Sequence, residues 1–319
     1  MTNNPKSFLA TGILFLLIMP VLLRAQTDED AIMMTKSNLC VGAIYSYSSW
    51  DHYWEGTLKR NNQNLGTVST QNYGLMAIYG ITDKLNVMAN APYVTTHSSA
   101  GTLHGQQGVQ DLSAWIKWEA VEINSGKTSF SVYALGGGSV PLTNYIADYL
   151  PLSIGLHSKT LSGRVIADIQ AGDLFATASG TYTYRSNITI DRTSYYTTEL
   201  HLTNKVEMPD MASFGLRAGY RTNRWIIEAL FSRMITLGGF DMRRNDMPFP
   251  SNKMNATMVG ANFKYEFSMV KGLSLTGGGN YTIAGRNVGQ ARAFDIGAFY
   301  ILDFSHKKKT IAKPNPKMN

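Results

Sequence analysis

The chain has 319 residues, and a hydrophobic fraction of 44% with a mean hydropathy of −0.13 argues against a bundle of membrane-spanning helices. Its formal net charge of +7 comes from the two ends, because residues 26–304 are neutral once Lys6, Arg24 and the five lysines of the last fifteen residues are set aside. A neutral body argues against nucleic-acid binding, and a single cysteine, Cys40, excludes an intrachain disulfide.

The N-terminus has the pattern of an export signal. Lys6 precedes an apolar run over residues 8–23, and the small residue Ala25 follows. This order predicts a secretory signal peptide over residues 1–25. A transmembrane anchor is the alternative, but the run is short for a bilayer and Pro20 interrupts its end.

After the signal, residues 26–38 form a short segment that we expect to lie in the periplasm or inside the lumen of a barrel, since it is too short for a plug domain. Beyond it, apolar and polar residues alternate. In GVQDLSAWIKWEAV, residues 108–121, the apolar set includes Leu112, Ile116 and Trp118, whereas Lys117 lies in the opposite, polar set. Such a period of two predicts a β-strand with one apolar and one polar face.

The same alternation recurs along the chain and predicts an all-β fold of about twelve strands, with ten or fourteen as alternatives. The predicted strands lie near residues 39–49, 66–81, 85–96, 108–121, 128–140, 153–170, 174–186, 208–221, 225–237, 254–268, 273–284 and 291–304. Several apolar faces end in aromatic residues, as an interfacial girdle requires.

The connections between these strands alternate in length. Five are tight and polar, near residues 82–84, 124–127, 171–173, 222–224 and 269–272, and longer irregular stretches lie between them. Short turns at one end and long loops at the other are typical of outer-membrane barrels. We therefore predict a transmembrane up-and-down antiparallel β-barrel over residues 39–304, followed by a Lys-rich disordered tail at 305–319. A soluble β-sandwich is the less favoured alternative.

Projecting the polar faces inward gives a set of candidate lumen residues of both charge signs. It comprises Asp111, Lys117, Glu119, Arg164, Asp168, Arg185, Arg217, Arg221, Glu228, Lys264, Glu266 and Asp295. Paired charges of this kind brace a narrow barrel or form a polar constriction that filters solutes. The mixed signs argue against a strongly ion-selective pore.

Two long loops contain aromatic and apolar side chains that need a binding partner or a packing surface. Trp50 and Trp54 lie in WDHYW, and Phe240, Arg243, Arg244 and Phe249 lie in GGFDMRRNDMPFP. They are candidates for the entry site of a hydrophobic solute, with packing against the barrel rim and lipopolysaccharide as the alternative.

An enzymatic function has little support in the sequence. A lipid hydrolase would need a serine next to a histidine base, and His157 with Ser158 is the only adjacent pair in a predicted strand. Adjacent strand residues point to opposite faces. His97 and His104 share a loop that offers no cysteine or acid to complete a metal site. We predict no catalytic residues, no metal and no cofactor.

Two stretches are similar to a known family. YGITDKLNVMANAPYV (79–94) followed by GVQDL (108–112), and AGDLFATASGTYTYR (171–185), resemble the outer-membrane family named for the MetA pathway of phenol degradation, a relative of the fatty-acid channels. Gln110 departs from the glycine usual there. The resemblance implies passage of small hydrophobic or aromatic molecules across the outer membrane, and it supplies no catalytic residues.

Together these patterns predict a monomeric outer-membrane channel for passive uptake of small hydrophobic or aromatic compounds, in contact with outer-membrane lipid and lipopolysaccharide. The alternative is a non-conducting barrel with a surface-binding or structural role.

Overall fold

The computed structural model describes residues 27–244 and 246–305, so the predicted signal peptide and almost all of the Lys-rich tail lie outside the described residues. Twelve long strands form the wall. They are β1 (Asn38–Trp50), β4 (Val68–Thr82), β5 (Leu85–Ser98), β7 (Asp111–Ser125), β8 (Thr128–Pro141), β9 (Thr160–Ala171), β10 (Leu174–Arg185), β15 (Met211–Arg221), β16 (Trp225–Thr236), β17 (Asn255–Glu266), β18 (Leu273–Arg286) and β19 (Arg292–Asp303).

The sheet closes on itself. Each wall strand pairs antiparallel with its neighbour in the chain, and β1 pairs with both β4 and β19. The closing register runs from Asn38 opposite Asp303 to Ser49 opposite Arg292. Closure leaves no unpaired sheet edge, which a lipid environment demands. The prediction of a twelve-stranded up-and-down barrel is confirmed.

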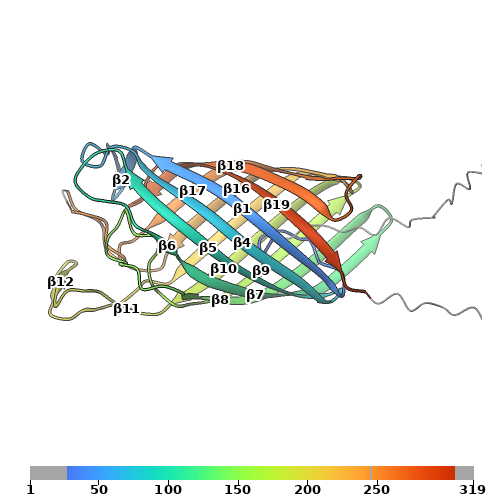
Figure 1. The fold of residues 1–319 in the computed structure, drawn as a ribbon, viewed down its shortest axis with the longest axis horizontal. Helices are drawn as coiled ribbons and strands as arrows, with labels where there is room; N and C mark the ends of the chain where they lie inside the picture. The colour runs from blue at the N-terminus through green and yellow to red at the C-terminus, as the bar shows by residue number, and fades with distance from the viewer. Residues whose placement is uncertain (1–26, 245, 306–319) are drawn as a thin grey trace, which may run out of the picture.

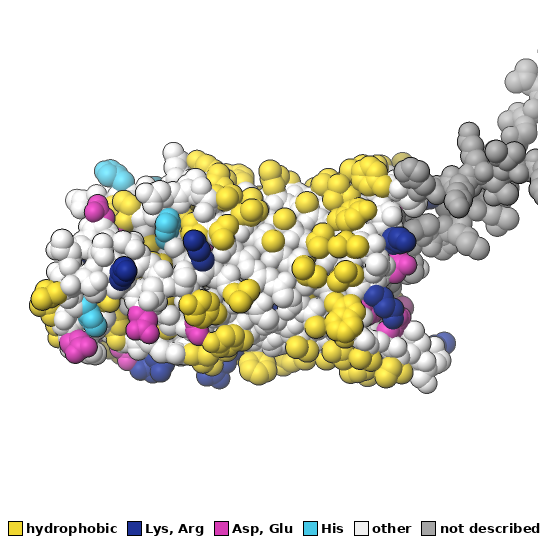
Figure 2. Space-filling model, turned by 90° about the horizontal axis from the view of Figure 1, so that it is seen from below, with side chains coloured by type: hydrophobic (Ala, Val, Ile, Leu, Met, Phe, Trp, Pro, Cys, Tyr) yellow, Lys and Arg dark blue, Asp and Glu magenta, His cyan; other side chains and the backbone are white. Residues whose placement is uncertain are grey.

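The apolar face of each strand points outward. On β7, Ile116 and Trp118 are 55% and 52% exposed, whereas Lys117 between them is fully buried. Hydrophobic side chains cover the barrel wall, and charged and histidine side chains gather toward its ends (Figure 2). An apolar outer surface and a polar inner one are the arrangement of a transmembrane barrel. No helix long and apolar enough to cross a bilayer occurs in the described part of the chain.

The two ends of the barrel differ, as predicted. One end has tight turns, and the other has the long loops (Figure 1). Gly126, Gly172 and Gly272 take positive φ angles of 59°, 61° and 82° in three of the turns, where a side chain would be strained. The first wall strand begins and the last one ends at the tight-turn end (Figure 1).

The long loops contain short strands that the sequence pattern does not predict. β2 (His52–Glu55) pairs with β3 (Leu58–Asn61), β11 (Ile188–Thr189) with β14 (Lys205–Val206), and β12 (Tyr195–Tyr196) with β13 (Leu200–His201). β6 (Gln107–Val109) pairs with residues 93–95 of β5, near the long loops. β7 pairs with residues 85–90 of β5, near the tight turns.

The largest error in the predicted boundaries concerns β9, which begins at Thr160 rather than near residue 153. Leu152, Ile154 and Leu156 alternate like a strand, but they lie in the loop over the barrel mouth. The Ser153 hydroxyl donates to the Gly155 carbonyl at 2.6 Å, and His157 has a φ of 56°, which ends any extended run.

Candidate functional site

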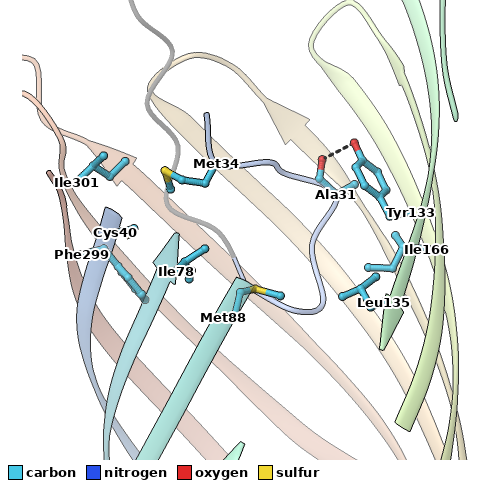
Figure 3. Packing of buried hydrophobic residues seen from close by; sticks show 10 residues of the cluster. All are labelled: Ala31, Met34, Cys40, Ile78, Met88, Tyr133, Leu135, Ile166, Phe299 and Ile301. Atoms are coloured by element: carbon cyan, nitrogen blue, oxygen red, sulfur yellow. Dashed lines mark hydrogen bonds between the residues drawn. The ribbon is translucent and has the colours of Figure 1, made fainter. Parts of the chain in front are cut away.

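Residues 27–37, hereafter the N-terminal segment, lie inside the barrel. Ala31 and Met34 pack against inward-facing apolar side chains of the wall, including Ile78, Met88 and Tyr133 (Figure 3). The backbone N–H of Met34 donates to Asn86 Oδ1 at 2.9 Å, and Asn86 Nδ2 donates back to the Met34 carbonyl at 2.8 Å. The segment is therefore hydrogen-bonded to the Asn86 side chain of β5 inside the lumen.

Three consecutive acids of this segment, Asp28, Glu29 and Asp30, form the acidic triad. Arg164 Nη1 lies 2.9 Å from Asp28 Oδ2, and Arg217 Nη2 lies 2.6 Å from Glu29 Oε2. Lys117 Nζ lies 3.2 Å from Asp30 Oδ1. Burial, followed by the neighbouring Glu29 carboxylate, raises the pKa of Asp28, and the Arg164 guanidinium opposes the rise. Three wall strands thus bind three successive residues of the segment.

Lys117 makes the densest contacts with the segment. Its ammonium donates to the carbonyls of Asp30 at 2.6 Å, Ile32 at 2.9 Å and Thr27 at 3.3 Å, in addition to the Asp30 carboxylate. Its side chain is fully buried. Burial of an ammonium is costly unless it is paired and hydrogen-bonded, and the folded segment supplies the acceptors that make this burial possible.

A second group of charges braces the wall itself. Arg221 Nη1 lies 3.0 Å from Asp168 Oδ2, and the Arg221 guanidinium lies 3.8 Å from the centroid of the Phe175 ring. Arg217 Nη1 contacts Glu228 Oε1 at 2.9 Å, and Asn262 Nδ2 donates to the same oxygen at 3.1 Å. These pairs leave few charges free to attract a mobile ion.

The other predicted lumen residues also lie on inward-facing positions of their strands. Lys264 is 8% exposed, and Glu119 and Glu266 lie toward the tight-turn end. The Arg185 backbone N–H donates to Asp210 Oδ1 at 3.0 Å. Asp111 lies near the outer end, where it accepts a 2.6 Å hydrogen bond from Tyr145 Oη. The sequence candidates therefore occupy different depths of the lumen and form more than one site.

Two cavities lie beside the N-terminal segment. The first, of about 150 Å³, is bordered by Asp30 and by wall residues of β1 and β15–β19, including Ile44, Ile226 and Phe299. The second, of about 450 Å³, is bordered by Glu29, Arg164 and residues of β10 and β15–β19. Arg217, Asn262 and Asp295 border both cavities. The lumen is therefore partly filled by the segment and partly hollow.

Loop residues 142–159 cover part of the outer mouth. Leu152 is fully buried with Leu65 and Val68, and Thr96 Oγ1 donates to its carbonyl at 2.6 Å. Tyr145 packs edge-on against His157, with ring centroids 4.9 Å apart. Burial, followed by the Asp111 hydrogen bond, raises the pKa of the Tyr145 hydroxyl, which therefore stays protonated and acts as a donor.

The two tryptophans proposed for solute entry pack against the loop between β18 and β19. Trp54 is 8% exposed, and its backbone N–H donates to the Val288 carbonyl at 2.9 Å. Trp50 lies edge-on to Tyr53 with a centroid distance of 6.3 Å. Both indoles thus brace one side of the outer rim.

The other entry candidates lie in the loop between β16 and β17. Phe249 stacks on Tyr195 at 5.3 Å and lies 6.3 Å from Phe240. The Arg243 guanidinium lies 4.6 Å from the centroid of the Tyr196 ring, and Arg244 is exposed. These four residues form a second aromatic and cationic group, and Asn287 joins their loop to the β2–β3 hairpin that contains Trp54 by accepting from the Gly56 and Met242 N–H groups.

The His157–Ser158 pair lies in the loop before β9 rather than in a strand, which corrects the predicted position. Ser158 Oγ donates to the Ser186 carbonyl at 2.6 Å. The described residues contain no group of three or more His, Cys, Asp or Glu side chains placed to hold a metal ion.

Comparison with known structures supports the fold. An outer membrane channel from Pseudomonas putida aligns over 88% of this chain and 100% of its own, with a TM-score of 0.67 and 13% identity. The fold is that of an outer-membrane β-barrel. No protein-family model and no curated protein sequence matches the chain.

Other barrels are more distant. The CymD monoaromatic hydrocarbon channel aligns over 86% of this chain and 90% of its own, with a TM-score of 0.38 and 11% identity. The transport unit of the Escherichia coli autotransporter AIDA-I aligns over 88% and 94%, with a TM-score of 0.45 and 11% identity. Scores at this level support no inference about function.

The acidic triad is the part of the site that sequence reasoning missed. Its three residues precede the first strand, outside the alternating pattern that identified the wall residues. The available signal was the run of acids itself, which follows closely after the predicted signal peptide in a chain whose predicted lumen positions include several cations.

Proposed function

We propose that this protein is a passive outer-membrane channel for small hydrophobic or aromatic solutes. The observation that supports this most strongly is the pair of cavities beside the N-terminal segment. They share three bordering residues, Arg217, Asn262 and Asp295, and therefore lie side by side in the lumen.

The chemistry of the interior supports the proposed solute class. Part of the first cavity's wall is apolar, with Ile44, Ile226 and Phe299 bordering it, and several of the charges around it are paired with one another. A solute without a formal charge has little to lose by entering such a lumen. The aromatic surfaces around Trp50 and Phe249 are the proposed places where it first adsorbs.

The outer-membrane location follows from the same fold. Exposed apolar residues cover the wall, and export by the predicted signal peptide would bring the chain to that membrane. We also propose that the chain is related to the MetA-pathway family that its hairpins resemble, and that it acts as a monomer without catalytic activity.

A whole-cell uptake assay tests the function. The fluorescent apolar probe N-phenyl-1-naphthylamine enters intact Gram-negative cells slowly, because lipopolysaccharide excludes it. Cells producing this protein should take it up severalfold faster. Ser213→Trp, which places an indole in the second cavity, should abolish the gain, whereas Ala212→Trp, at the outward-facing neighbouring position of β15, should retain it.

Equal uptake by the two tryptophan variants would show that the probe does not pass through the lumen. An absence of any gain with correctly inserted protein would favour the alternative, a non-conducting barrel with a surface-binding role. The segment within the lumen and the loop over the mouth are the observations that favour this alternative.

A further inference from the structure

Asp295 of β19 occupies a distinctive place between the two cavities. It is half-buried, it borders both cavities, and within the described part of the chain its carboxylate has no hydrogen-bond or ion-pair partner. A carboxylate removed from bulk water favours a donor that satisfies its oxygens. The carboxylate oxygens that lack a donor face the hollow part of the lumen.

The sheet register explains why this carboxylate has no partner. The residues directly opposite Asp295 are Ser46 on β1 and Gly278 on β18. The next inward-facing residues on its own strand are Ala293 and Gly297. None of the four has a side chain that can reach the carboxylate with a positive charge, so the space around Asp295 is left to a ligand.

Three of the arginines that border the cavities already have carboxylate partners. Arg164 is paired with Asp28, Arg217 with Glu29 and Glu228, and Arg221 with Asp168. An anion entering the cavities would have to compete with these carboxylates and would meet Asp295 as a like charge. A cation would meet an acceptor that is free.

The remaining wall of the first cavity is apolar on one side. Ile44, Ile226 and Phe299 border it together with Asp295. A cavity of about 150 Å³ can enclose a benzene-sized group. Asp30 and Glu228 also border this cavity, but they are paired with Lys117 and Arg217. The site therefore combines space for a ring or short alkyl body with the Asp295 carboxylate, which also borders the second cavity.

We propose that Asp295 is the recognition point of a binding site for small amphipathic amines, which present a protonated amino group to the carboxylate and an apolar or aromatic body to the first cavity. This inference rests on the proposed function only in requiring that solutes reach the lumen. It adds molecules with a cationic end to the uncharged solutes of the proposed function.

Isothermal titration of the processed full chain in lipid nanodiscs tests the site directly. The probe is 2-phenylethylamine at neutral pH, with phenylacetate as its anionic counterpart of similar size. We expect saturable binding of the amine and none of the acid. Asp295→Asn should weaken amine binding at least about tenfold, since it removes the charge of the one acceptor and keeps its shape.

Asp173→Asn is the matched control, because Asp173 lies in a turn outside the lumen, where it accepts a 2.9 Å hydrogen bond from Tyr220 Oη. It should bind the amine like the unmodified chain. A second pair of variants tests the register argument. Ser46→Lys places an ammonium opposite Asp295 and should abolish amine binding, whereas the neutral Ser46→Gln should retain most of it.

Unchanged affinity in Asp295→Asn, or binding of phenylacetate at least as tight as that of the amine, would overturn the proposal. The probe-uptake assay separates this failure from that of the channel function. Amine binding without uptake by cells would leave the site intact and reject the channel, whereas uptake without selective amine binding would do the reverse.

Discussion

At the scale of single residues, Lys117 shows how the lumen and the N-terminal segment depend on each other. Its side chain is fully buried and its ammonium contacts four oxygens of the segment. On an isolated barrel the same side chain would face water or an empty cavity. The lysine therefore fixes where the segment lies, and the segment makes a buried lysine tolerable.

Replacing Lys117 with Met should consequently destabilise the protein. The variant leaves the Asp30 carboxylate and three carbonyls without their donor, and loss of one member of a buried ion pair costs about 3 kcal/mol or somewhat more. The measurement is denaturant-induced unfolding in lipid vesicles, followed by tryptophan fluorescence.

Lys127→Met, an exposed change in the turn between β7 and β8, serves as its control and should shift the free energy of unfolding by less than about 0.5 kcal/mol. Equal stability of the two variants would mean that Lys117 does not hold the segment.

At the scale of elements, the N-terminal segment is held chiefly by the acidic triad, whose members contact β7, β9 and β15. Neutralising all three, as Asp28→Asn, Glu29→Gln and Asp30→Asn, keeps their shapes but removes three ion pairs. We expect much faster backbone hydrogen exchange over residues 27–37, because the segment then opens from the wall more often.

Neutralising three exposed acids of the outer loops, Glu199, Glu207 and Asp246, should leave that exchange unchanged. If backbone hydrogen exchange over residues 27–37 is as slow in the triad variant as in the unmodified chain, apolar packing around Met34 alone holds the segment.

The loop between β16 and β17 is fastened by Asp241. Its carboxylate accepts hydrogen bonds from Arg286 Nε at 2.7 Å and from Asn287 Nδ2 at 2.9 Å, and chiefly the Arg286 hydrogen bond lowers the pKa of Asp241 to about 2. Because the folded-state pKa lies below the ordinary value of 3.8, this contribution to stability is present above pH 3.8 and is lost as the pH falls toward 2.

Asp241→Asn should release this loop at neutral pH. Trypsin cleavage after Arg243 and Arg244 should become severalfold faster, and hydrogen exchange in the unmodified chain should show the same release only between about pH 4 and pH 2. The control is Asp246→Asn, which removes the exposed carboxylate paired with Arg243 in the same loop. It tests whether the loss of any negative charge from the loop is enough to release it. Identical cleavage rates in the two variants would contradict the assigned role of Asp241.

The strands could be predicted from the sequence far better than the site. The alternation on β7 can be read directly from residues such as Ile116 and Lys117. Successive side chains of a strand point to opposite faces, so an odd or even position number decides which side of the wall a residue lies on. The contacts of Asp28 with Arg164 and of Glu29 with Arg217 join residues more than 130 positions apart. No local pattern contains them, and they depend on barrel closure and on the path of a segment that has no regular structure.

At the scale of the whole molecule, one pattern determines both the boundary with lipid and the character of the lumen. Exposed Leu161, Phe214 and Ile116 point to the membrane side, while the neighbouring residues of the same strands point inward and carry the charges. The barrel closes because an open edge would leave backbone groups unpaired in lipid. The lumen then becomes a compartment that the N-terminal segment divides into docked and hollow parts.

The most direct test of this account is the single-channel conductance of the processed chain in a planar lipid bilayer. The hollow part of the lumen predicts small, discrete current steps, and Ser213→Trp should reduce them while Ala212→Trp should not. Protein that migrates as a folded barrel before boiling on a denaturing gel, yet gives no current steps in the bilayer, would contradict the claim that the lumen is a passage.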